Sequence, residues 1–296
     1  MVHDVVFRPG EGASSALSRR AACGRYEHAS VHHPSSPILS ATAPSAEVTR
    51  ILNDPRYASP KRISRCGWRA SSQTDEDGLI QEIFRRIGTT GRRFLEIGVG
   101  DGLENNTAYL LACGWSGTWI ESDAERSAAI LRNCESAIRE GRLAVLGVPA
   151  TPAGVDELIL DSGLNGEIDL LSLDIDGNDY HVLRSITAVR PRVVVVEYNA
   201  SYHPPVRWIM PYDPAHRWDG SNHFGASLEA YADLLGALGY ALVGCGIAGI
   251  NAFFVRADLA AERFAAPFDA ANHFEPPRYY LAAHFAQLSG HPPRRG

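Results

Sequence analysis

Residues 93 to 102 read RFLEIGVGDG, and this stretch decides the fold of the chain. Its first half, Arg93–Ile97, is a short and mostly apolar run of the kind that forms a buried strand. Three glycines follow within five residues, and glycine lets the backbone turn sharply and approach a ligand closely. Tyr109–Ala112 then continues in a helical pattern that Gly114 ends. The stretch therefore predicts a strand, a glycine loop and a helix in succession.

Short apolar runs and helical patterns alternate along most of the remaining chain. We predict further strands at 118–121, 143–147, 168–174, 193–197, 240–244 and 251–256. We predict helices at 79–87, 124–138, 155–160, 180–186 and 228–238, with Asp123, Asp179 and Ser227 as helix caps. Repeated strand–helix units imply a parallel, doubly wound α/β sheet. The last two strands lie too close together for a helical crossover, so they must form an antiparallel hairpin.

The spacing of the glycines distinguishes between two classes of nucleotide cofactor. A nicotinamide dinucleotide site has the pattern G-x-G-x-x-G, and its third glycine would fall on Leu103 here. The pattern from Glu96 to Gly102 is E-x-G-x-G-x-G, which looks like the loop that binds S-adenosylmethionine (SAM). An acid at the start of this loop can hold the ammonium group of SAM, whereas it would repel a diphosphate. The alternative is a structural turn that binds no ligand.

An acidic residue also ends the second predicted strand. Glu121 lies 23 residues after Gly98, and an acid at this place can accept hydrogen bonds from both ribose hydroxyls of a nucleoside. Its alternative role is to help cap the helix that follows. We predict that the SAM-binding residues are Glu96, Gly98, Gly100, Asp101, Gly102 and Glu121.

With these residues in place, the chain resembles the class I SAM-dependent methyltransferases, and within them the FkbM-like group. The stretch Asp169–Tyr180, DLLSLDIDGNDY, and the later run Val193–Glu197 are similar to that group's K-I-D-V-E-G and I-E strands. Ser172 stands where lysine is usual, and Asp176 stands where glutamate is usual. The segment Ser72–Gly78, SQTDEDG, also recurs in such proteins.

The resemblance implies a fold and a reaction. It covers about residues 68–257 and implies a Rossmann-like, doubly wound, mostly parallel sheet of seven strands in the order 3-2-1-4-5-7-6, with an antiparallel last strand. It also implies SAM-dependent O-methyl transfer to a hydroxyl of a small molecule or sugar, as in secondary metabolism or glycan modification. Two other interpretations stay open, namely an NAD(P)-dependent sugar-modifying enzyme and a non-catalytic scaffold with a methyltransferase fold.

The chain divides into one catalytic domain and two flanking segments. We predict an irregular N-terminal extension at 1–66, a methyltransferase domain at 67–258 and a C-terminal tail at 259–296. The extension is rich in Ala, Ser, Pro and His and has no clear periodicity. Aromatic clusters in the tail predict that it packs back on the core.

Composition restricts the partners and the compartment. The formal charge is −6, but residues 71–296 carry 18 basic and 29 acidic residues, which disfavours a nucleic-acid partner and suits a small neutral or cationic substrate. Five cysteines without a C-x-x-C pair argue against a disulfide framework and a zinc site. The sequence holds neither an apolar run long enough to span a membrane nor a secretory signal core. We therefore expect a cytoplasmic protein without a membrane partner, and leave a homodimer open as its assembly.

Acidic residues follow the fourth and fifth predicted strands. Asp174 and Asp176 end one strand, and Glu197 and Asn199 end the other. Ligands of such sheets bind outside the carboxyl ends of the strands, and oxygen ligands from two strand ends suit Mg²⁺, which would lower the pKa of an acceptor hydroxyl. We predict these four residues as metal ligands. The alternative is that Asp176 and Asp179 form an Asx-turn and a helix cap.

Without a metal, deprotonation of a hydroxyl acceptor needs a general base. Asp174 and the histidines at 181, 203 and 223 are candidates, since neutral imidazole accepts a proton near pH 7. We take Asp174, His203 and His181 as the predicted catalytic residues, and His203 stands out because it follows the fifth strand closely and precedes two prolines.

The long segment 199–225 is aromatic and has little periodicity. A loop of this length beside the carboxyl edge of a sheet is usually functional. We predict that its Trp208, Tyr212, Trp218 and Phe224 line the acceptor pocket. The alternative is that these aromatic side chains anchor the loop by packing.

Overall fold

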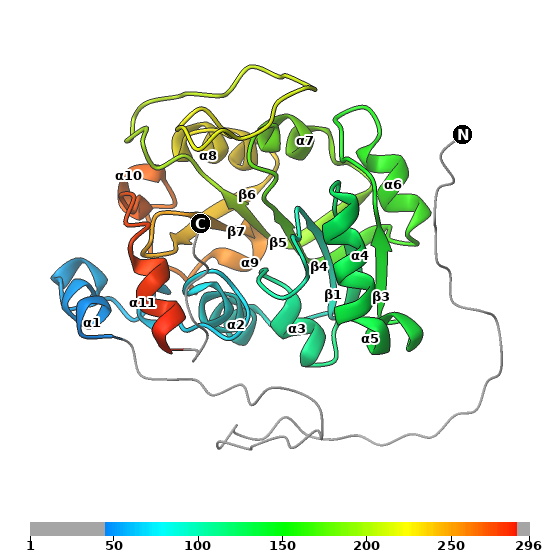
Figure 1. Cartoon of the computed structure of the whole chain (residues 1–296). Coiled ribbons are helices and arrows are strands. Elements are labelled where there is room, and N and C mark those ends of the chain that lie inside the picture. The colour runs from blue at the N-terminus through cyan, green and yellow to red at the C-terminus, as the bar shows by residue number, and fades with distance from the viewer. Residues whose placement is uncertain (1–44, 289–296) are drawn as a thin grey trace.

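A seven-stranded sheet forms the centre of the computed structural model, which describes residues 45–288, and helices pack on both faces of the sheet (Figure 1). The strands are β1 (Arg93–Ile97), β2 (Ser116–Ile120), β3 (Leu143–Leu146), β4 (Gly166–Leu173), β5 (Val189–Glu197), β6 (Tyr240–Cys245) and β7 (Asn251–Arg256). Their order across the sheet is β3-β2-β1-β4-β5-β7-β6. Strand β7 runs antiparallel to β5 and β6, and the other paired strands are parallel. The predicted Rossmann-like α/β fold and its strand order are confirmed.

Alternate residues of the central strands enter two separate cores, because successive side chains of a strand point to opposite faces. Val194 and Val196 of β5 join one core, whereas Val193 and Val195 join the other. The first core lies under α6 (Val155–Asp161), α7 (Asp179–Ser185) and α8 (Leu228–Ala237), and the second under α2 (Glu76–Ile87), α3 (Ala108–Ala112), α4 (Ala124–Asn133) and α5 (Glu135–Arg139). A strand buried on both faces is apolar at every position, which explains the continuous valine run of β5.

Two predicted helix boundaries are wrong. The helix expected at 124–138 is divided into α4 and α5 at Cys134, whose backbone leaves helical geometry with φ −117° and ψ 19°. Asn133 and Cys134 are both weak helix formers, which favours a break there. Asp179 is the first residue of α7, and Asn178 is the N-cap. The remaining predicted strands and helices occur within a few residues of their expected positions.

The segment before residue 67 is partly helical where we expected irregular structure. Helix α1 (Ala46–Leu52) begins after Ser45, whose hydroxyl accepts a hydrogen bond from the N–H of Val48. Val48 and Ile51 share a small core with Leu281 of α11 (Leu281–Leu288), so the ends of the described chain pack together. The short helices η1 (Pro55–Tyr57), η2 (Ser64–Cys66), α9 (Ala257–Ala260) and α10 (Ala270–His273) complete the described elements. Residues 1–44 of the predicted extension lie outside the described residues.

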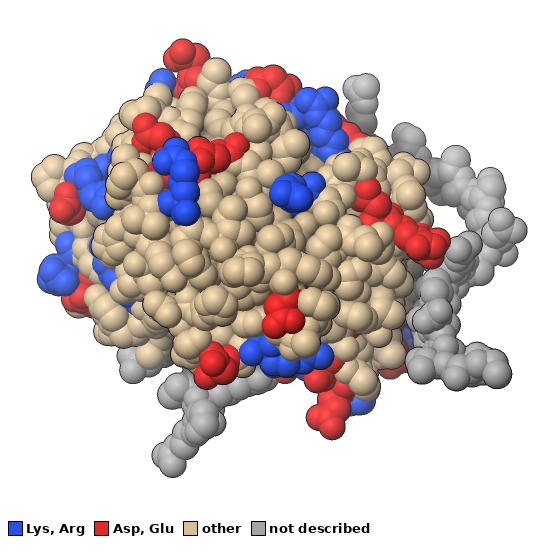
Figure 2. Space-filling model, turned by 90° about the horizontal axis from the view of Figure 1, so that it is seen from above, with Lys and Arg blue, Asp and Glu red and all other residues tan. Residues whose placement is uncertain are grey.

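The surface seen from above the view of Figure 1 carries charges of both signs, interspersed around a broad neutral area (Figure 2). Basic side chains do not gather into one large patch on this face. Within residues 45–288, no helix combines the length and the apolar character needed to cross a membrane.

Candidate active site

The glycine loop follows β1 at the carboxyl edge of the sheet. Gly98, Gly100 and Gly102 have φ angles of +85°, +65° and +79°, a left-handed conformation that favours glycine. A Cβ atom at Gly98 would lie 1.6 Å from the backbone oxygen of Asp174, whereas a Cβ atom at Gly100 would meet no atom within 4 Å. The glycine loop therefore touches the loop after β4 at Gly98, whereas the space next to Gly100 is free.

Glu121 connects the end of β2 to the glycine loop. Its side chain is buried, and its Oε2 atom accepts hydrogen bonds from the N–H groups of Val99 and Gly100 at 3.2 and 2.8 Å. Its Oε1 atom accepts from the N–H of Asp123, which is itself the N-cap of α4. The carboxylate thus stands beside the loop as predicted for a ribose-binding acid, and the ribose contact itself stays a prediction.

Glu96 supports the start of α3. The buried carboxylate accepts hydrogen bonds from the N–H groups of Asn106 and Thr107 and from the Thr107 hydroxyl. Burial nevertheless raises the pKa of Glu96 to about 7, although these hydrogen bonds act in the opposite direction. Asp101, within the loop, accepts a hydrogen bond from the N–H of Leu103. Contacts of either side chain with SAM stay predictions.

Three of the four predicted metal ligands come together where β4 and β5 end. Asp174, Asp176 and Glu197 each offer a carboxylate oxygen, and these oxygens all lie within 4.8 Å of one another. We call these three residues the acid cluster. The Oε2 atom of Glu197 is buried and has no hydrogen-bond partner. The cluster therefore presents a buried oxygen atom that the surrounding protein leaves unpaired.

The electrostatics of the acid cluster are unfavourable. Burial, followed by the charges of Asp179 and Asp176, raises the pKa of Asp174 well above its ordinary value. Burial and the charge of Asp174 raise the pKa of Glu197 in the same way. A cation bound beside the two carboxyl groups would act in the opposite direction and favour their ionised forms.

Asp179 shapes the turn that carries the acid cluster. Its carboxylate accepts hydrogen bonds from the N–H groups of Ile175 and Gly177, at 2.7 and 2.8 Å. Asp176, between them, has a left-handed φ of +56° and an exposed side chain. The turn predicted as the alternative to a metal site is thus formed by Asp179 alone, and it leaves the Asp176 carboxylate available.

Asn199, the fourth predicted metal ligand, has a different contact set. Its Nδ2 atom donates to the backbone oxygens of Asn222 and Phe224, and its Oδ1 atom accepts from the N–H of Ser201. The side chain closes the base of the long loop, because it ties residues at both ends of that loop together. The structure therefore does not place Asn199 with the acid cluster.

The predicted catalytic histidines, His181 and His203, contact residues outside the acid cluster. The Nε2 atom of His181 lies 2.8 Å from the backbone oxygen of Met210, and the ring of His203 packs on Phe274 with 4.7 Å between ring centroids. Neither residue is part of the acid cluster. Their role as general bases has no contact that supports it in this structure.

His216 is a residue that sequence reasoning missed. Its Nε2 atom lies 3.1 Å from the backbone oxygen of Asp176, and a Cβ atom at Gly177 would lie 2.3 Å from its Cδ2 atom. The ring therefore rests on the turn that carries Asp176. Residue 216 lies 40 positions further along the chain than Asp176, in a loop without periodicity, so no local pattern points to it.

The aromatic residues of the long loop divide into anchors and exposed side chains. Trp208 stacks on Tyr202 with ring centroids 4.3 Å apart, and Phe224 is buried. Trp218 and Tyr212 are 53% and 45% exposed. Trp208 and Phe224 thus anchor the loop by packing. An acceptor pocket lined by the four aromatic residues stays a prediction.

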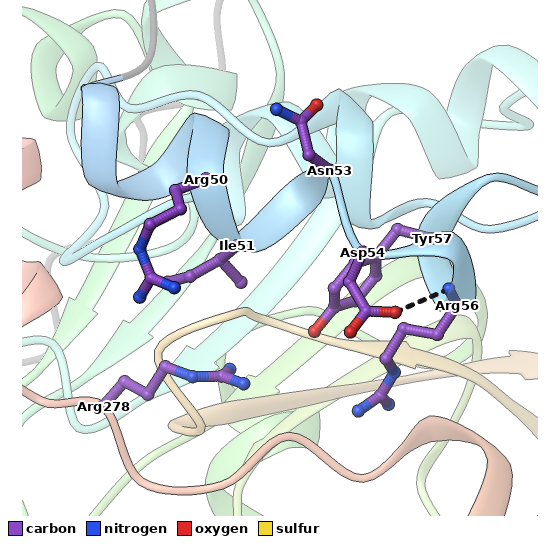
Figure 3. Close-up of a pocket in the computed structure, with 7 residues that line it drawn as sticks. All are labelled: Arg50, Ile51, Asn53, Asp54, Arg56, Tyr57 and Arg278. Atoms are coloured by element: carbon purple, nitrogen blue, oxygen red, sulfur yellow. Dashed lines mark hydrogen bonds between the residues drawn. The ribbon is translucent and has the colours of Figure 1, made fainter.

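A separate polar cavity of about 430 Å³ lies between α1 and the C-terminal segment (Figure 3). Its lining residues are Arg50, Ile51, Asn53, Asp54, Arg56, Tyr57 and Arg278. Behind it, the buried Glu275 carboxylate accepts from the Tyr57 hydroxyl and pairs with Arg56 and Arg278. This network ties the two flanking segments together, and none of its members is a predicted site residue.

Comparison with known families gives a match within the predicted domain at 67–258. Residues 89–217 match the profile described as the methyltransferase FkbM domain. This range contains the glycine loop, Glu121 and the whole acid cluster. No curated protein in the comparison matches significantly.

Several solved structures show a distant likeness. A putative caffeoyl-CoA O-methyltransferase from Staphylococcus aureus is 16% identical, with a TM-score of 0.40 over 60% of this chain and 81% of that one. A putative O-methyltransferase from Klebsiella pneumoniae is 18% identical, with a TM-score of 0.40 over 71% and 94% of the two chains. The glycopeptide N-methyltransferase MtfA, complexed with sinefungin, is 14% identical, with a TM-score of 0.38 over 61% and 86%.

Proposed function

We propose that this chain, an FkbM-like class I methyltransferase, transfers the methyl group of SAM to a hydroxyl of a small molecule or sugar. The contact between Gly98 and Asp174 carries the proposal. It joins the glycine loop, which has the SAM-type pattern, to the turn that holds the acid cluster. A methyl donor held by the loop and a hydroxyl held by the acids would therefore be neighbours, and proximity with in-line geometry is the main requirement of such a transfer.

The chain's own residues supply the binding and proton-handling parts of the reaction. SAM, when bound, supplies an electrophilic methyl group on a sulfonium. The Gly100 position gives backbone access at the loop tip, and Glu121 is the acid beside it that would accept the ribose hydroxyls. Burial raises the pKa of Asp174 and of Glu197, which makes either carboxylate a stronger base toward an acceptor hydroxyl.

We also propose that Mg²⁺ assists the reaction at the acid cluster. The residues fit a hard cation, since three carboxylate oxygens lie within 4.8 Å of one another and the buried Oε2 atom of Glu197 has no partner. Mg²⁺, when bound, lowers the pKa of a coordinated hydroxyl. Asp174, Asp176 and Glu197 would hold it, and binding would offset the repulsion between their charges.

The alternatives to methyl transfer have less support. The third position of a nicotinamide pattern is Leu103, whose side chain is 57% exposed at the end of the glycine loop. A pure scaffold gives no reason for a buried carboxylate oxygen without a partner, because such an atom lowers stability. We further propose a small neutral or cationic acceptor, a cytoplasmic location, and no nucleic-acid or membrane partner.

The proposal is tested by transfer of a labelled methyl group. The full chain would be incubated with methyl-labelled SAM and a panel of hydroxyl-bearing sugars and secondary metabolites, with Mg²⁺ or with EDTA. We expect label in at least one acceptor, lower turnover in EDTA and recovery when Mg²⁺ is added. Full turnover in EDTA would contradict the metal step alone, and transfer only to amines would contradict the choice of a hydroxyl.

A further inference from the structure

Two buried oxygen atoms without partners lie on adjacent strands. One is the Oε2 atom of Glu197, the last residue of β5, and the other is the Oδ1 atom of Asn251, the first residue of β7. Asn251 is only 3% exposed. A buried oxygen without a partner destabilises the fold, and its presence in a folded protein calls for an explanation such as a bound ion.

The sheet register places these two side chains together. Glu197 and Asn251 are direct partners in the antiparallel pairing of β5 with β7, so their side chains leave the same face of the sheet. Residues two positions apart in a strand share a face. Val193 and Val195 therefore lie on the same face as Glu197, and Phe253 lies on the same face as Asn251. All three belong to the core that α2 covers, so Glu197 and Asn251 also lie on the α2 side of the sheet. The Asn251 side chain is therefore the nearest neighbour of Glu197 across the two strands.

Glu76 determines the orientation of the Asn251 side-chain amide. The Nδ2 atom of Asn251 donates to Glu76 Oε1 at 3.1 Å. Glu76 is itself buried and held by the N–H and the hydroxyl of Thr74. Because a carboxylate can only accept hydrogen bonds, the amide nitrogen must face Glu76 and the Oδ1 atom must face the other side.

This arrangement differs from that of Asn199, whose amide nitrogen donates twice and whose oxygen accepts a hydrogen bond within the long loop. We infer that Asn251 supplies a neutral oxygen ligand to a divalent cation held by the acid cluster, and that Glu76 is its positioning residue. The inference rests on the Mg²⁺ assistance proposed above. The three carboxylates of the acid cluster already exceed the +2 charge of a divalent cation, so a neutral oxygen adds coordination without adding repulsion.

The test uses Mn²⁺ as the probe for the divalent site, because its binding can be followed by electron paramagnetic resonance and by calorimetry without any acceptor. The full chain would be compared with Asn251→Leu, which removes the oxygen at similar size, and with Asn251→Ala, which removes it in a smaller side chain. Glu76→Gln would test the positioning role, since glutamine no longer forces the amide orientation. Melting temperature and affinity for S-adenosylhomocysteine would be measured for every variant as checks on folding and on the glycine loop.

We expect one Mn²⁺ per wild-type chain, binding weakened at least about tenfold in Asn251→Leu and in Asn251→Ala, and a smaller loss in Glu76→Gln. Wild-type affinity in a folded Asn251→Leu variant would overturn the inference. If Asn251→Leu does not fold, wild-type affinity in Asn251→Ala would overturn it. Absence of Mn²⁺ binding to the wild type would overturn both this inference and the metal step, whereas S-adenosylhomocysteine binding in the same samples would leave the methyl-transfer proposal standing.

Discussion

Carboxylates end strands at two places along the carboxyl edge of the sheet, Glu96 and Glu121 buried and Asp174 and Glu197 half-buried, and their surroundings differ. At β1 and β2, Glu96 and Glu121 accept hydrogen bonds from backbone N–H groups of the adjoining loops. At β4 and β5, Asp174 and Glu197 face each other, and one oxygen of Glu197 has no partner. A carboxylate with donors around it is a satisfied structural contact, whereas one without them destabilises the fold. Retained electrostatic strain of this kind is typical of binding and catalytic sites.

The largest expected effect comes from Gly98→Val, which acts on both places. The new Cβ atom would collide with the backbone oxygen of Asp174, and valine does not tolerate the φ of +85°. We expect a loss of about 3 kcal/mol or more in the free energy of unfolding, measured by urea titration, and loss of measurable S-adenosylhomocysteine binding. Gly100→Ala is the control, since its Cβ atom meets open space and only the backbone cost of about 1–2 kcal/mol remains. Equal stability of the two variants would show that the two places are not in contact.

The substitution Glu121→Gln tests the place where donors surround the carboxylate. Glutamine would turn an N–H donor toward N–H groups that now donate to Glu121, so we expect a loss of about 1–3 kcal/mol in the free energy of unfolding. Urea titration measures this loss, and calorimetry should show weaker S-adenosylhomocysteine binding. An unchanged free energy of unfolding would contradict the structural part of this role.

The same change at Glu197 is expected to have the opposite sign. Burial and the Asp174 charge raise the folded-state pKa of Glu197 above its ordinary value of 4.5, so its ionisation destabilises the fold as pH rises through that window. Glu197→Gln removes this penalty, and we expect a gain of about 1–2 kcal/mol at pH 8 in EDTA. The gain should disappear as the pH falls toward 4.5, as thermal unfolding at several pH values would show. If Glu197→Gln were less stable than the wild type at pH 8, the proposed difference between the carboxylates at β1 and β2 and those at β4 and β5 would be contradicted.

The smallest expected effect is that of His216→Ala. The substitution removes a single contact with the backbone oxygen of Asp176 and the packing of the ring on Gly177. We expect a loss of about 1 kcal/mol or less in the free energy of unfolding, with S-adenosylhomocysteine affinity unchanged. A loss several times larger would show that the long loop is part of the structural core and does more than cover the acid cluster.

The fold was largely predictable because its signals are local. The apolar run of β5, the glycines after β1 and the short connection between β6 and β7 each specify their own geometry from neighbouring residues. The break of the helix at Cys134 was missed, because helical periodicity continues on both sides of it. Helix α1 was missed because its apolar residues are few and gain their stability from α11, which is remote in sequence.

Site residues at the ends of strands could be predicted from the sequence, whereas site residues within the long loop could not. The parallel strands β4 and β5 bring the acid cluster together, so strand assignment was enough for these three residues. The roles of Asn199 and His216 depend on the path of the 199–225 loop, which has no repeating pattern. The position of Asn251 beside Glu197 depends on the register between β5 and β7, and hydrophobic patterning alone does not specify that register.

The measurement that tests the central claim most directly is a calorimetric titration of the wild-type chain with S-adenosylhomocysteine and, separately, with NAD. The account predicts one S-adenosylhomocysteine bound per chain, lost in Gly98→Val, and no binding of NAD. Binding of NAD without binding of S-adenosylhomocysteine would contradict the assignment of the glycine loop to a sulfonium nucleoside, and the roles proposed for the acid cluster would then lose their basis.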